Sequence, residues 1–264
     1  MKDIIFEIIG SILIIREQKD EVILEKFSRE MLQKYPSIKT VVVQTSKIKG
    51  IERVREFKHI MGIKTFETIH KEYGNIYELD ISTTFFSPRL SYERQRISKT
   101  VNKGEVILNF FSGVGPFSIA IAKKCENCLI HSIEMNKNAY HYLTRNIERN
   151  KCKDKIKAYC GDAFNIVPQI FYGTSDRVLL PLPLEAEKSL PVAFNALKEG
   201  KGTVHWQITE KIIDKEKIKR ALDEKIRTVL KTNHIRASFT IINSRLIRWL
   251  APRVAHIAVD LVFS

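Results

Sequence analysis

The chain has 264 residues, 44% of them hydrophobic, which is enough to bury a sizeable core in one large domain or two unequal ones. The first apolar run, over residues 4–15, is interrupted by Glu7 and Gly10 and is too short to cross a bilayer. No small-residue cleavage site follows this run, so no secretory signal is expected. These features predict a cytoplasmic protein without a membrane anchor.

The charge balance is strongly basic. Forty-four Lys and Arg residues face 30 Asp and Glu residues, which leaves a net charge of +14. Each phosphate that a basic side chain contacts releases a condensed counterion, so this excess favours a nucleic-acid partner. The alternative is a thermophile-type composition rich in Lys, Ile and Glu, whose charges are spread over solvated helix faces. The charge therefore supports a polyanionic partner without establishing one.

The first part of the chain is predicted to be a small mixed α/β domain over residues 1–97. Its expected elements are a strand over 4–15, a helix over 21–34, a strand over 40–44 and a hairpin of strands 65–70 and 76–81. Gly74 and Asn75 suit the tight turn of that hairpin. The stretch 47–57 mixes charged and apolar residues without a clean period, and it could present basic groups to a substrate.

From about residue 98, strands alternate with helical segments, which predicts a parallel sheet with crossover helices over residues 98–264. The expected strands are 106–111, 128–133, 156–159, 177–180 and 202–207, with helices over 116–124 and 138–150. Segments 238–242 and 256–262 suit a closing β-hairpin with a long connection. The predicted fold class is α/β, with a Rossmann-like domain preceded by the smaller mixed α/β domain.

Four cysteines raise the question of a metal site. Cys125 and Cys128 form a C-x-x-C pair, a spacing found among zinc ligands. That pair lies where a predicted helix gives way to a strand, and Cys152 and Cys160 have seven residues between them rather than two or three. We therefore expect buried or loop thiols in a reducing cytosol and no metal, with an adventitious disulfide as the alternative.

Two glycines mark the turn between the first strand of the parallel sheet and its helix. Gly113 and Gly115 lack a Cβ, so a ligand can approach the backbone there closely. Glu134 ends the next predicted strand and Asp162 follows the third. An acid at the second strand end can accept both ribose hydroxyls of an adenosine, and one after the third can address the adenine amino group. The pattern predicts a nucleoside pocket.

Two other interpretations of the glycines compete with this one. A dinucleotide site requires a third glycine where the helix packs on the strand, but Pro116 and Phe117 follow Gly115 and no pyrophosphate-binding helix start is evident. A tight turn without a ligand is disfavoured by the companion acids. We therefore predict S-adenosylmethionine as the cofactor. The predicted contacts are Phe111, Gly113, Gly115, Glu134, Met135, Asp162 and Ala163.

Further motifs resemble the archaeal and eukaryotic tRNA (guanine37-N1)-methyltransferase family over nearly the whole chain. They stand in the family's order at residues 6–10, 53–57, 68–74, 86–94, the Gly113 loop and 251–253. The run Ser-Pro-Arg-Leu-Ser-Tyr-Glu-Arg at 87–94 is the most specific of these. The closest paralogue, which transfers an aminocarboxypropyl group from the same cofactor to a wyosine precursor, looks different at that run. The resemblance implies a Rossmann-like methyltransferase domain that acts on guanosine 37 of tRNA.

The same resemblance implies roles for individual residues. Glu93 would be the general base that takes the N1 proton, and Arg55 would hydrogen-bond the guanine O6 as negative charge builds there. Arg53 is the alternative to Arg55 for this contact. Arg89 and Arg94 would position phosphate or the cofactor carboxylate by forked hydrogen bonds, and a surface ion pair is the alternative for each of them.

The chain departs from the family pattern at two places. Asn109 stands where the family usually has Asp, so a charge that organises the glycine loop is absent. Pro181, Leu182 and Pro183 replace the family's Asn-Leu-Pro, so a polar contact near the target base is lost, although Leu182 and Pro183 can still wall the pocket. Two alternatives therefore stay open: aminocarboxypropyl transfer, and a non-catalytic RNA-binding protein that kept the fold.

Recognition of tRNA is expected to rest on the anticodon stem-loop. A splayed base would stack on Phe85 or Phe86, either of which can equally be a core residue. The basic residues expected to hold phosphates are Lys47, Lys49, Arg53 and Lys58. Guanosine alone, or also inosine or a wyosine precursor, remains open as the target, and a monomer is the expected oligomeric state.

Overall fold

The computed structural model describes residues 4–46, 54–212 and 218–264. Its smaller unit contains β1 (Phe6–Ile9), β2 (Ile12–Ile15), α1 (Glu21–Lys34), β3 (Thr40–Gln44) and β4 (Phe57–Gly62). The hairpin of β5 (Glu67–Glu72) and β6 (Asn75–Asp80) is followed by η1 (Pro88–Leu90) and α2 (Ser91–Ser98). The strands of the larger unit are β7 (Val106–Asn109), β8 (Leu129–Glu134), β9 (Ile156–Cys160), β10 (Arg177–Leu180), β11 (Gly202–Lys211), β12 (Phe239–Ala251) and β13 (Val254–Phe263). Its helices are α3 (Pro116–Ala122), α4 (Lys137–Arg149), α5 (Ala163–Ile170), η2 (Pro183–Glu185), α6 (Ala186–Ala196), η3 (Lys198–Gly200) and α7 (Ile218–Thr232).

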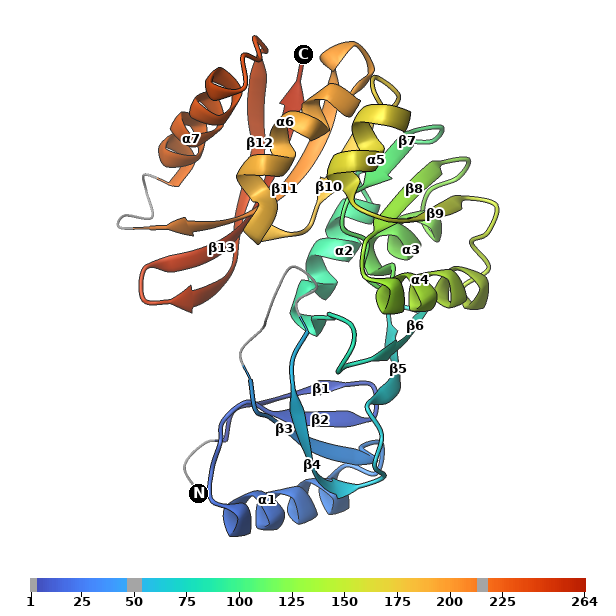
Figure 1. Cartoon of the computed structure of the whole chain (residues 1–264), viewed down its shortest axis with the longest axis vertical. Coiled ribbons are helices and arrows are strands. Elements are labelled where there is room, and N and C mark those ends of the chain that lie inside the picture. The colour runs from blue at the N-terminus through green and yellow to red at the C-terminus, as the bar shows by residue number, and fades with distance from the viewer. Residues whose placement is uncertain (1–3, 47–53, 213–217) are drawn as a thin grey trace.

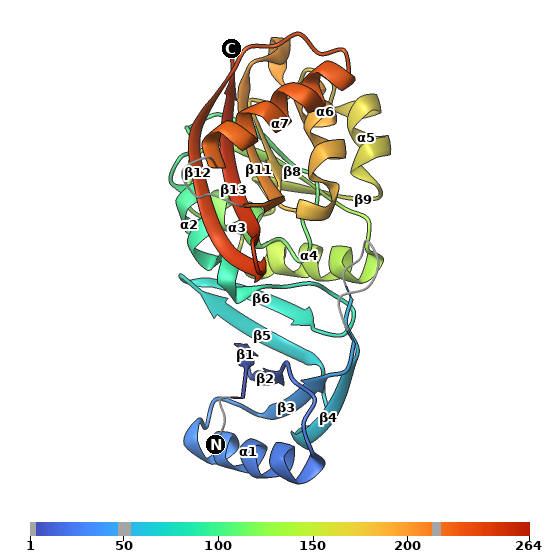
Figure 2. The ribbon, with the colours of Figure 1, turned by 90° about the vertical axis from the view of Figure 1, so that its left-hand side faces the viewer.

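The two units lie end to end, with the hairpin β5-β6 between them (Figures 1 and 2). The small sheet has the order β1-β2-β3-β4, and the large one has the order β12-β13-β11-β10-β7-β8-β9. The predicted α/β fold class is confirmed, and the predicted boundary between residues 97 and 98 falls at the end of α2. Within the three described ranges, no helix is both long and apolar enough to span a bilayer.

The small unit confirms the predicted helix and the strand that follows it, but the first predicted strand is wrong. Residues 4–15 form the hairpin β1-β2, which turns at Gly10. Gly10 has a φ of +56°, and a Cβ there would lie 2.2 Å from the Thr68 side-chain oxygen, so this close approach requires glycine. All four residues of β2 are buried, and the continuous apolar run hides the turn. Strand β4 was not predicted, because Lys58 and His59 interrupt its apolar pattern.

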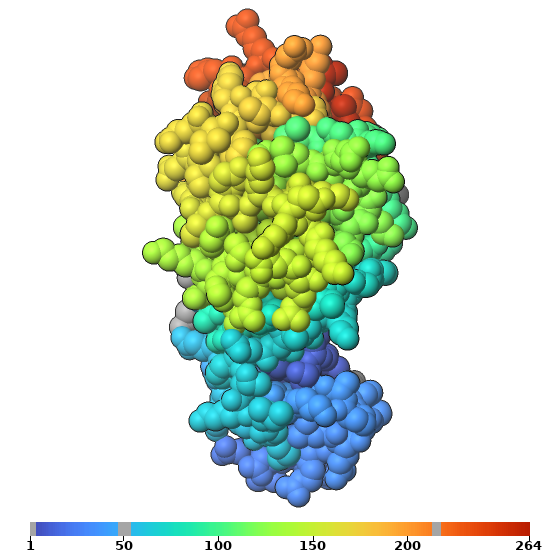
Figure 3. All heavy atoms as spheres, turned by 90° about the vertical axis from the view of Figure 1, so that its right-hand side faces the viewer, coloured from blue at the N-terminus to red at the C-terminus, as the bar shows by residue number. Residues whose placement is uncertain are grey.

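The hairpin β5-β6 agrees with the prediction and fixes the small unit to the large one. Its two turn residues, Tyr73 and Gly74, both have positive φ, as tight hairpin turns require. The Asn146 side-chain oxygen accepts the Glu78 N–H at 2.7 Å, and the Asn150 oxygen accepts the Ile76 N–H at 2.9 Å. Figure 3 shows the cyan hairpin in direct contact with the green surface of α4. The units therefore share a polar, side-chain-specific junction.

The large sheet is the middle layer of a three-layer sandwich. Strands β9, β8, β7, β10 and β11 run parallel; β13 pairs antiparallel with β11, and the edge strand β12 pairs antiparallel with β13. Neighbouring residues of β7 face opposite layers: Ile107 belongs to the core under α3 and α4, and Leu108 to the core under α5, α6 and α7. Chain order reverses between β7 and β10, which creates a switch point where open parallel sheets bind ligands at their carboxyl edge.

The C-terminal hairpin differs from the expected form. Strands β12 and β13 extend over 13 and 10 residues and meet at Pro252 and Arg253, so the predicted long connection is wrong. Helix α7 was not predicted, although its apolar side chains recur at helical spacing and are buried. These buried residues are Leu222, Ile226, Val229 and Leu230.

The cysteines give a direct test of this packing. None of the four forms a disulfide; Cys125, Cys128 and Cys152 are buried, whereas Cys160 is exposed. Burial raises the pKa of the Cys128 thiol to about 12 and also raises that of Cys152. Because the thiolate is the reactive form, iodoacetamide at neutral pH should label Cys160 first and spare the other three until the chain unfolds. Mass spectrometry checks this, and rapid native-state labelling of Cys128 would contradict the packing.

Candidate functional site

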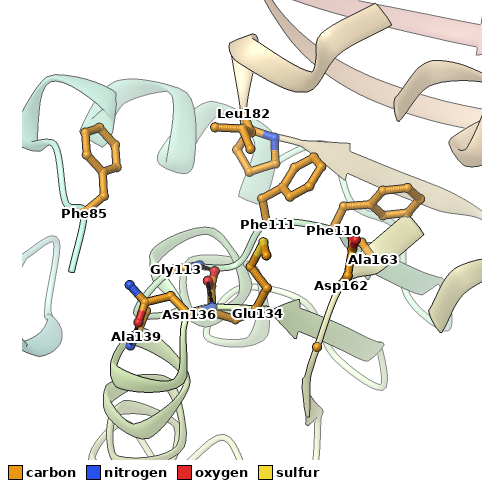
Figure 4. A pocket seen from close by; sticks show the side chains of 13 residues that line it. Phe85, Phe110, Phe111, Gly113, Glu134, Asn136, Ala139, Asp162, Ala163 and Leu182 are labelled. Atoms are coloured by element: carbon orange, nitrogen blue, oxygen red, sulfur yellow. Dashed lines mark hydrogen bonds between the residues drawn. The ribbon is translucent and has the colours of Figure 1, made fainter. Parts of the chain in front are cut away.

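A cavity opens at the carboxyl edge of the large sheet, beside the switch point (Figure 4). The empty space between its lining residues, including the part open to solvent, is about 590 Å³. The lining residues are Phe85, Phe110, Phe111, Gly113, Glu134, Met135, Asn136, Ala139, Gly161, Asp162, Ala163, Pro181 and Leu182. Six of the seven predicted cofactor contacts are therefore brought together here. The seventh, Gly115, is not one of the lining residues.

The glycine loop shapes one wall of this cavity. Gly113 lines it with a φ of +54°, while Gly115, with a φ of +92°, precedes the first residue of α3. A Cβ on Gly115 would lie 2.7 Å from Leu143 Cδ1 of α4, so this glycine serves helix packing rather than ligand contact. The buried Asn109, at the end of β7, donates from Nδ2 to the Ser118 hydroxyl at 3.0 Å. Asn109, in the position where the family usually has a charged Asp, thus contributes a neutral hydrogen bond to this loop.

Glu134 is held at the cavity by the backbone. Its two carboxylate oxygens accept the Gly113 N–H at 2.6 Å and the Asn136 N–H at 2.8 Å. A carboxylate has about four acceptor positions, so the same group is of the kind that can also accept a ribose hydroxyl. Asp162 lies at the end of the next strand, where its side chain also caps α5 by accepting the Phe164 N–H at 2.9 Å.

The rest of the lining is mostly apolar. Phe110, Phe111, Met135, Ala163 and Leu182 all line the cavity together with the two acids. An apolar cavity that also contains carboxylate acceptors suits an adenosine group, whose polar atoms include ribose hydroxyls and an amino group. Asn136, Ala139, Phe110 and Gly161 were not among the predicted contacts. Three of them directly adjoin a predicted contact in sequence, and Ala139 follows Met135 by four residues, which is the signal that could have found them.

The Glu134 carboxylate should control cofactor affinity. Glu134→Ala removes acceptors for ribose hydroxyls and the anchor of Gly113, and a hydrogen bond to a charged group contributes about 1.5–3 kcal/mol. The dissociation constant for S-adenosylmethionine should therefore rise at least about tenfold in isothermal titration. Glu126→Ala, at an exposed side chain on the same unit, is the matched control and should bind like the unaltered chain. Unchanged binding by Glu134→Ala would place the cofactor elsewhere.

The predicted substrate contacts are partly assembled at this cavity. Pro181 and Leu182 follow β10 and line it, and Pro183 begins η2 directly after them. Pro181 also borders a second cavity of about 240 Å³, on the side of α2 and β13. Of the two aromatic candidates for base stacking, Phe85 lines the cofactor cavity, whereas Phe86 is a core residue packed on His70 and Tyr77. The Phe86 alternative is therefore wrong.

Glu93 lies on α2 and is almost fully buried, with 1% of its surface exposed. Arg96 donates to one of its carboxylate oxygens at 3.0 and 2.8 Å, and Arg245 of β12 donates to the other. Arg96 also donates to the two carboxylate oxygens of Asp260 on β13, at 2.5 and 3.0 Å. The carboxylate thus sits between two guanidinium groups in a buried ionic network that sequence reasoning did not find.

The network extends from Asp260 to a histidine. His205 of β11 lies 2.6 Å from the Asp260 carboxylate. Burial acts to raise the pKa of Asp260, but hydrogen bonds from His205 and Arg96 outweigh it and hold this pKa well below its usual range. Burial lowers the pKa of His205, and its Nε2 lies 2.7 Å from the Arg177 guanidinium, which can only donate, so Arg96 is the main counter-charge of Asp260. The ionised Asp260 therefore anchors Arg96, which in turn holds Glu93.

The predicted arginines have different environments. Arg55 donates to Glu7 at 3.0 Å, and its guanidinium lies 5.7 Å from the Phe85 ring, close to the cofactor cavity. Arg89 is exposed on η1. Arg53, Lys47 and Lys49 lie outside the described residues.

Arg94 does not fit its predicted role. Its side chain is 1% exposed and donates to both carboxylate oxygens of Glu72, at 2.8 and 2.5 Å, and to the Ser87 carbonyl at 3.2 Å. A fully buried fork that is already bound to a carboxylate is not accessible to a phosphate or a cofactor in this structure. Lys58 is exposed on β4 and pairs with Glu21 of α1 at 2.8 Å, and it is not among the residues that line the cofactor cavity.

Known proteins resemble the chain over most of its length. The TRM5/TYW2 methyltransferase domain matches residues 68–236. The tRNA 4-demethylwyosine(37)-methyltransferase Taw21 of Saccharolobus solfataricus is 34% identical over 97% of this chain and 92% of its own. The tRNA (guanine(37)-N(1))-methyltransferase Trm5b of Pyrococcus abyssi is 34% identical over 97% of this chain and 73% of its own, and its crystal structure superposes with a TM-score of 0.83.

A third relative catalyses a different transfer. The tRNA(Phe) (4-demethylwyosine(37)-C(7)) aminocarboxypropyltransferase of Methanocaldococcus jannaschii is 30% identical over 98% of both chains. A crystal structure of M. jannaschii TYW2 in complex with AdoMet superposes with a TM-score of 0.71 at 26% identity and covers 98% of this chain and 99% of its own.

Proposed function

The chain belongs to the TRM5/TYW2 methyltransferase family, whose cofactor is S-adenosylmethionine, and from that premise we propose that it transfers the cofactor's methyl group to N1 of guanosine 37 in tRNA. The observation that carries the proposal is the cofactor cavity itself. It is closed on one side by Phe85, which precedes α2, and on another by Pro181 and Leu182, which follow β10. A base that enters between these walls meets the cofactor where the two units join.

The chain's own residues would perform the remaining chemistry. The cofactor supplies an already activated methyl group, so the enzyme's task is to position N1 in line with it and to remove the N1 proton. Glu93 would take that proton, and Arg55, beside Phe85, would hydrogen-bond the guanine O6. Arg96, anchored by Asp260, would hold one Glu93 oxygen in place. Arg245 would have to release the other oxygen, which then accepts the proton.

Methylation of a wyosine precursor at the same nucleotide is a second candidate. The observation that favours it is Pro181, which has neither the side-chain amide that the family usually places there nor a backbone N–H. A wall formed by Pro181 and Leu182 offers no donor to a guanine edge but accepts a larger, more apolar tricyclic base. Aminocarboxypropyl transfer is disfavoured by the intact run at residues 87–94.

The partner and setting follow from the same proposal. The substrate would be tRNA, recognised through its anticodon stem-loop by an enzyme that acts as a monomer in the cytoplasm. The net charge of +14 supports a polyanionic substrate of this kind.

The nucleoside product tests the proposal. Purified protein, S-adenosylmethionine and tRNA transcripts with G37 should yield 1-methylguanosine in a nuclease digest analysed by mass spectrometry. A transcript with A37 should yield no methylated nucleoside. If the G37 transcript stays unmodified while tRNA carrying the wyosine precursor gains one methyl group, the second candidate replaces the first. If neither RNA reacts although the cofactor binds, the chain is a non-catalytic member of the fold.

A further inference from the structure

Four arginines from separate segments meet near the junction of the two units. They are Arg16 after β2, Arg55 before β4, Arg89 in η1 and Arg248 in β12, and they are called the arginine cluster below. Glu7 of β1 is the carboxylate among them: it accepts Arg16 at 2.5 Å and Arg55 at 3.0 Å. The Glu7 side chain is 7% exposed, so this centre is buried, whereas Arg89 at its edge is exposed.

The register of β12 explains how Arg248 reaches this place. Arg245 opposes Ala258, Leu246 opposes Ile257 and Arg248 opposes His256, so Ile247 is an extra, bulged residue. Ala258 and His256 lie two apart on β13 and face the same side, so the bulge puts Arg245 and Arg248 on one face as well. Without it, they would point to opposite faces.

That shared face meets the segment that carries the family's most specific motif. Arg245 binds Glu93, and its guanidinium lies 3.9 Å from the centre of the Tyr92 ring. Arg248 lies three residues nearer the hairpin tip, and Arg89 of that segment is the charge that acts on it most strongly. Burial lowers the pKa of Arg248, and the charges of Arg89, Arg16 and Arg55 lower it further, with Glu7 acting in the opposite sense.

Within the described residues, the charges of this group do not balance. Glu7 is the carboxylate that pairs with its members there, and it can neutralise one guanidinium of four, so the remaining positive charges repel one another where water is partly excluded. In addition, the Arg16 Nε–H is buried and has no hydrogen-bond partner within the described part of the chain. A set of forked donors with an excess of positive charge fits a phosphate oxyanion.

We propose that Arg16, Arg89 and Arg248 of the arginine cluster bind a backbone phosphodiester of the substrate RNA beside the target nucleotide, while Arg55 contacts the base; Arg248 and Arg16 are thus phosphate contacts additional to Arg89. The position agrees with the proposed function, on which this inference rests: Arg55 adjoins Phe85, and Phe85 lines the cofactor cavity. A phosphate held at the cluster and a base placed at Phe85 would belong to the same stretch of RNA. Strand β12 thus becomes part of the RNA-binding surface.

Salt dependence of RNA binding is the test. The association constant for tRNA falls as salt concentration rises, and Arg248→Gln should make the slope of log association constant against log salt concentration less negative by about 0.7–0.9. This is the value for one lost phosphate contact. KM for tRNA should rise while kcat at saturating tRNA and the cofactor dissociation constant change little. Arg248→Lys keeps the charge and should restore most of the slope. Arg220→Gln, at an 82% exposed side chain of α7, is the matched control and should leave the slope unchanged.

The same variants separate this site from a structural role. Removing one of several like charges should leave the melting temperature unchanged or raise it at low salt, whereas loss of a structural ion pair would lower it. An unaltered slope in Arg248→Gln, or an equal fall in Arg220→Gln, would overturn the phosphate site. If the slope falls as expected but no RNA is methylated, the phosphate site stands and the proposed activity fails.

Discussion

Glu93→Gln is expected to lower the single-turnover rate of methyl transfer about 100- to 10,000-fold, the usual contribution of a positioned general base. The amide keeps the size of the carboxyl group but cannot take the N1 proton. Because Glu93 lies on α2 and the cofactor cavity is built from the strand ends of the large sheet, cofactor binding should be retained. Rapid-quench assays with saturating enzyme give the rate, and titration gives the cofactor affinity.

The control for this variant must separate chemistry from the broken ion pair. Arg245→Gln removes the same Glu93–Arg245 contact but leaves the carboxylate in place. If Glu93 is the base, Arg245→Gln should retain most of the rate while Glu93→Gln loses it. Equal losses in the two variants would show that Glu93 acts through the ionic network and that the base lies elsewhere.

Arg94→Met should destabilise the fold by about 3–5 kcal/mol, because it leaves the carboxylate of Glu72 buried without its counter-charge. The double variant Glu72→Leu, Arg94→Met removes both charges and should recover much of that loss, since buried pairs are often replaceable by apolar residues. Urea unfolding followed by circular dichroism measures both values.

Activity per folded molecule distinguishes the two roles considered for Arg94. If Arg94 only joins Ser87 and Glu72 around the start of α2, the double variant should methylate tRNA with a KM close to that of the unaltered chain. A stable double variant with a greatly raised KM for tRNA or cofactor would instead mean that Arg94 leaves Glu72 to bind a ligand.

The cofactor cavity was largely predictable from sequence, for a geometric reason. Parallel strands end at one edge of a sheet, so residues that follow them converge whatever their separation in the chain. Glu134 and Asp162 could therefore be assigned to one cavity with Gly113 from the sequence alone, whereas Pro181 was expected beside it from the family resemblance. The helices and strands in this region also have clear hydrophobic periods, and most of their expected bounds agree with the structure to within a few residues.

The ionic network and the arginine cluster were not predictable in this way. Arg96 and Asp260 are 164 positions apart and meet because β13 joins the sheet antiparallel beside β11 and faces α2. The face that Arg248 presents depends on a bulge at Ile247, and no local sequence signal marks it. Arg94 was predicted to be a ligand-binding residue from the family resemblance, and its actual partner, Glu72, lies 22 residues earlier at the end of β5. In each case the partners of the side chain depend on how segments distant in sequence pack together.

One measurement tests the central claim, methyl transfer to nucleotide 37 of tRNA, most directly. The purified chain is incubated with unmodified tRNA transcripts and S-adenosylmethionine that carries tritium in its methyl group and radiocarbon in its carboxyl group, and both labels are counted in the anticodon-loop fragment. The account predicts that tritium alone enters the RNA and that replacement of G37 abolishes its incorporation. Radiocarbon in the RNA, or tritium that persists without G37, would contradict it.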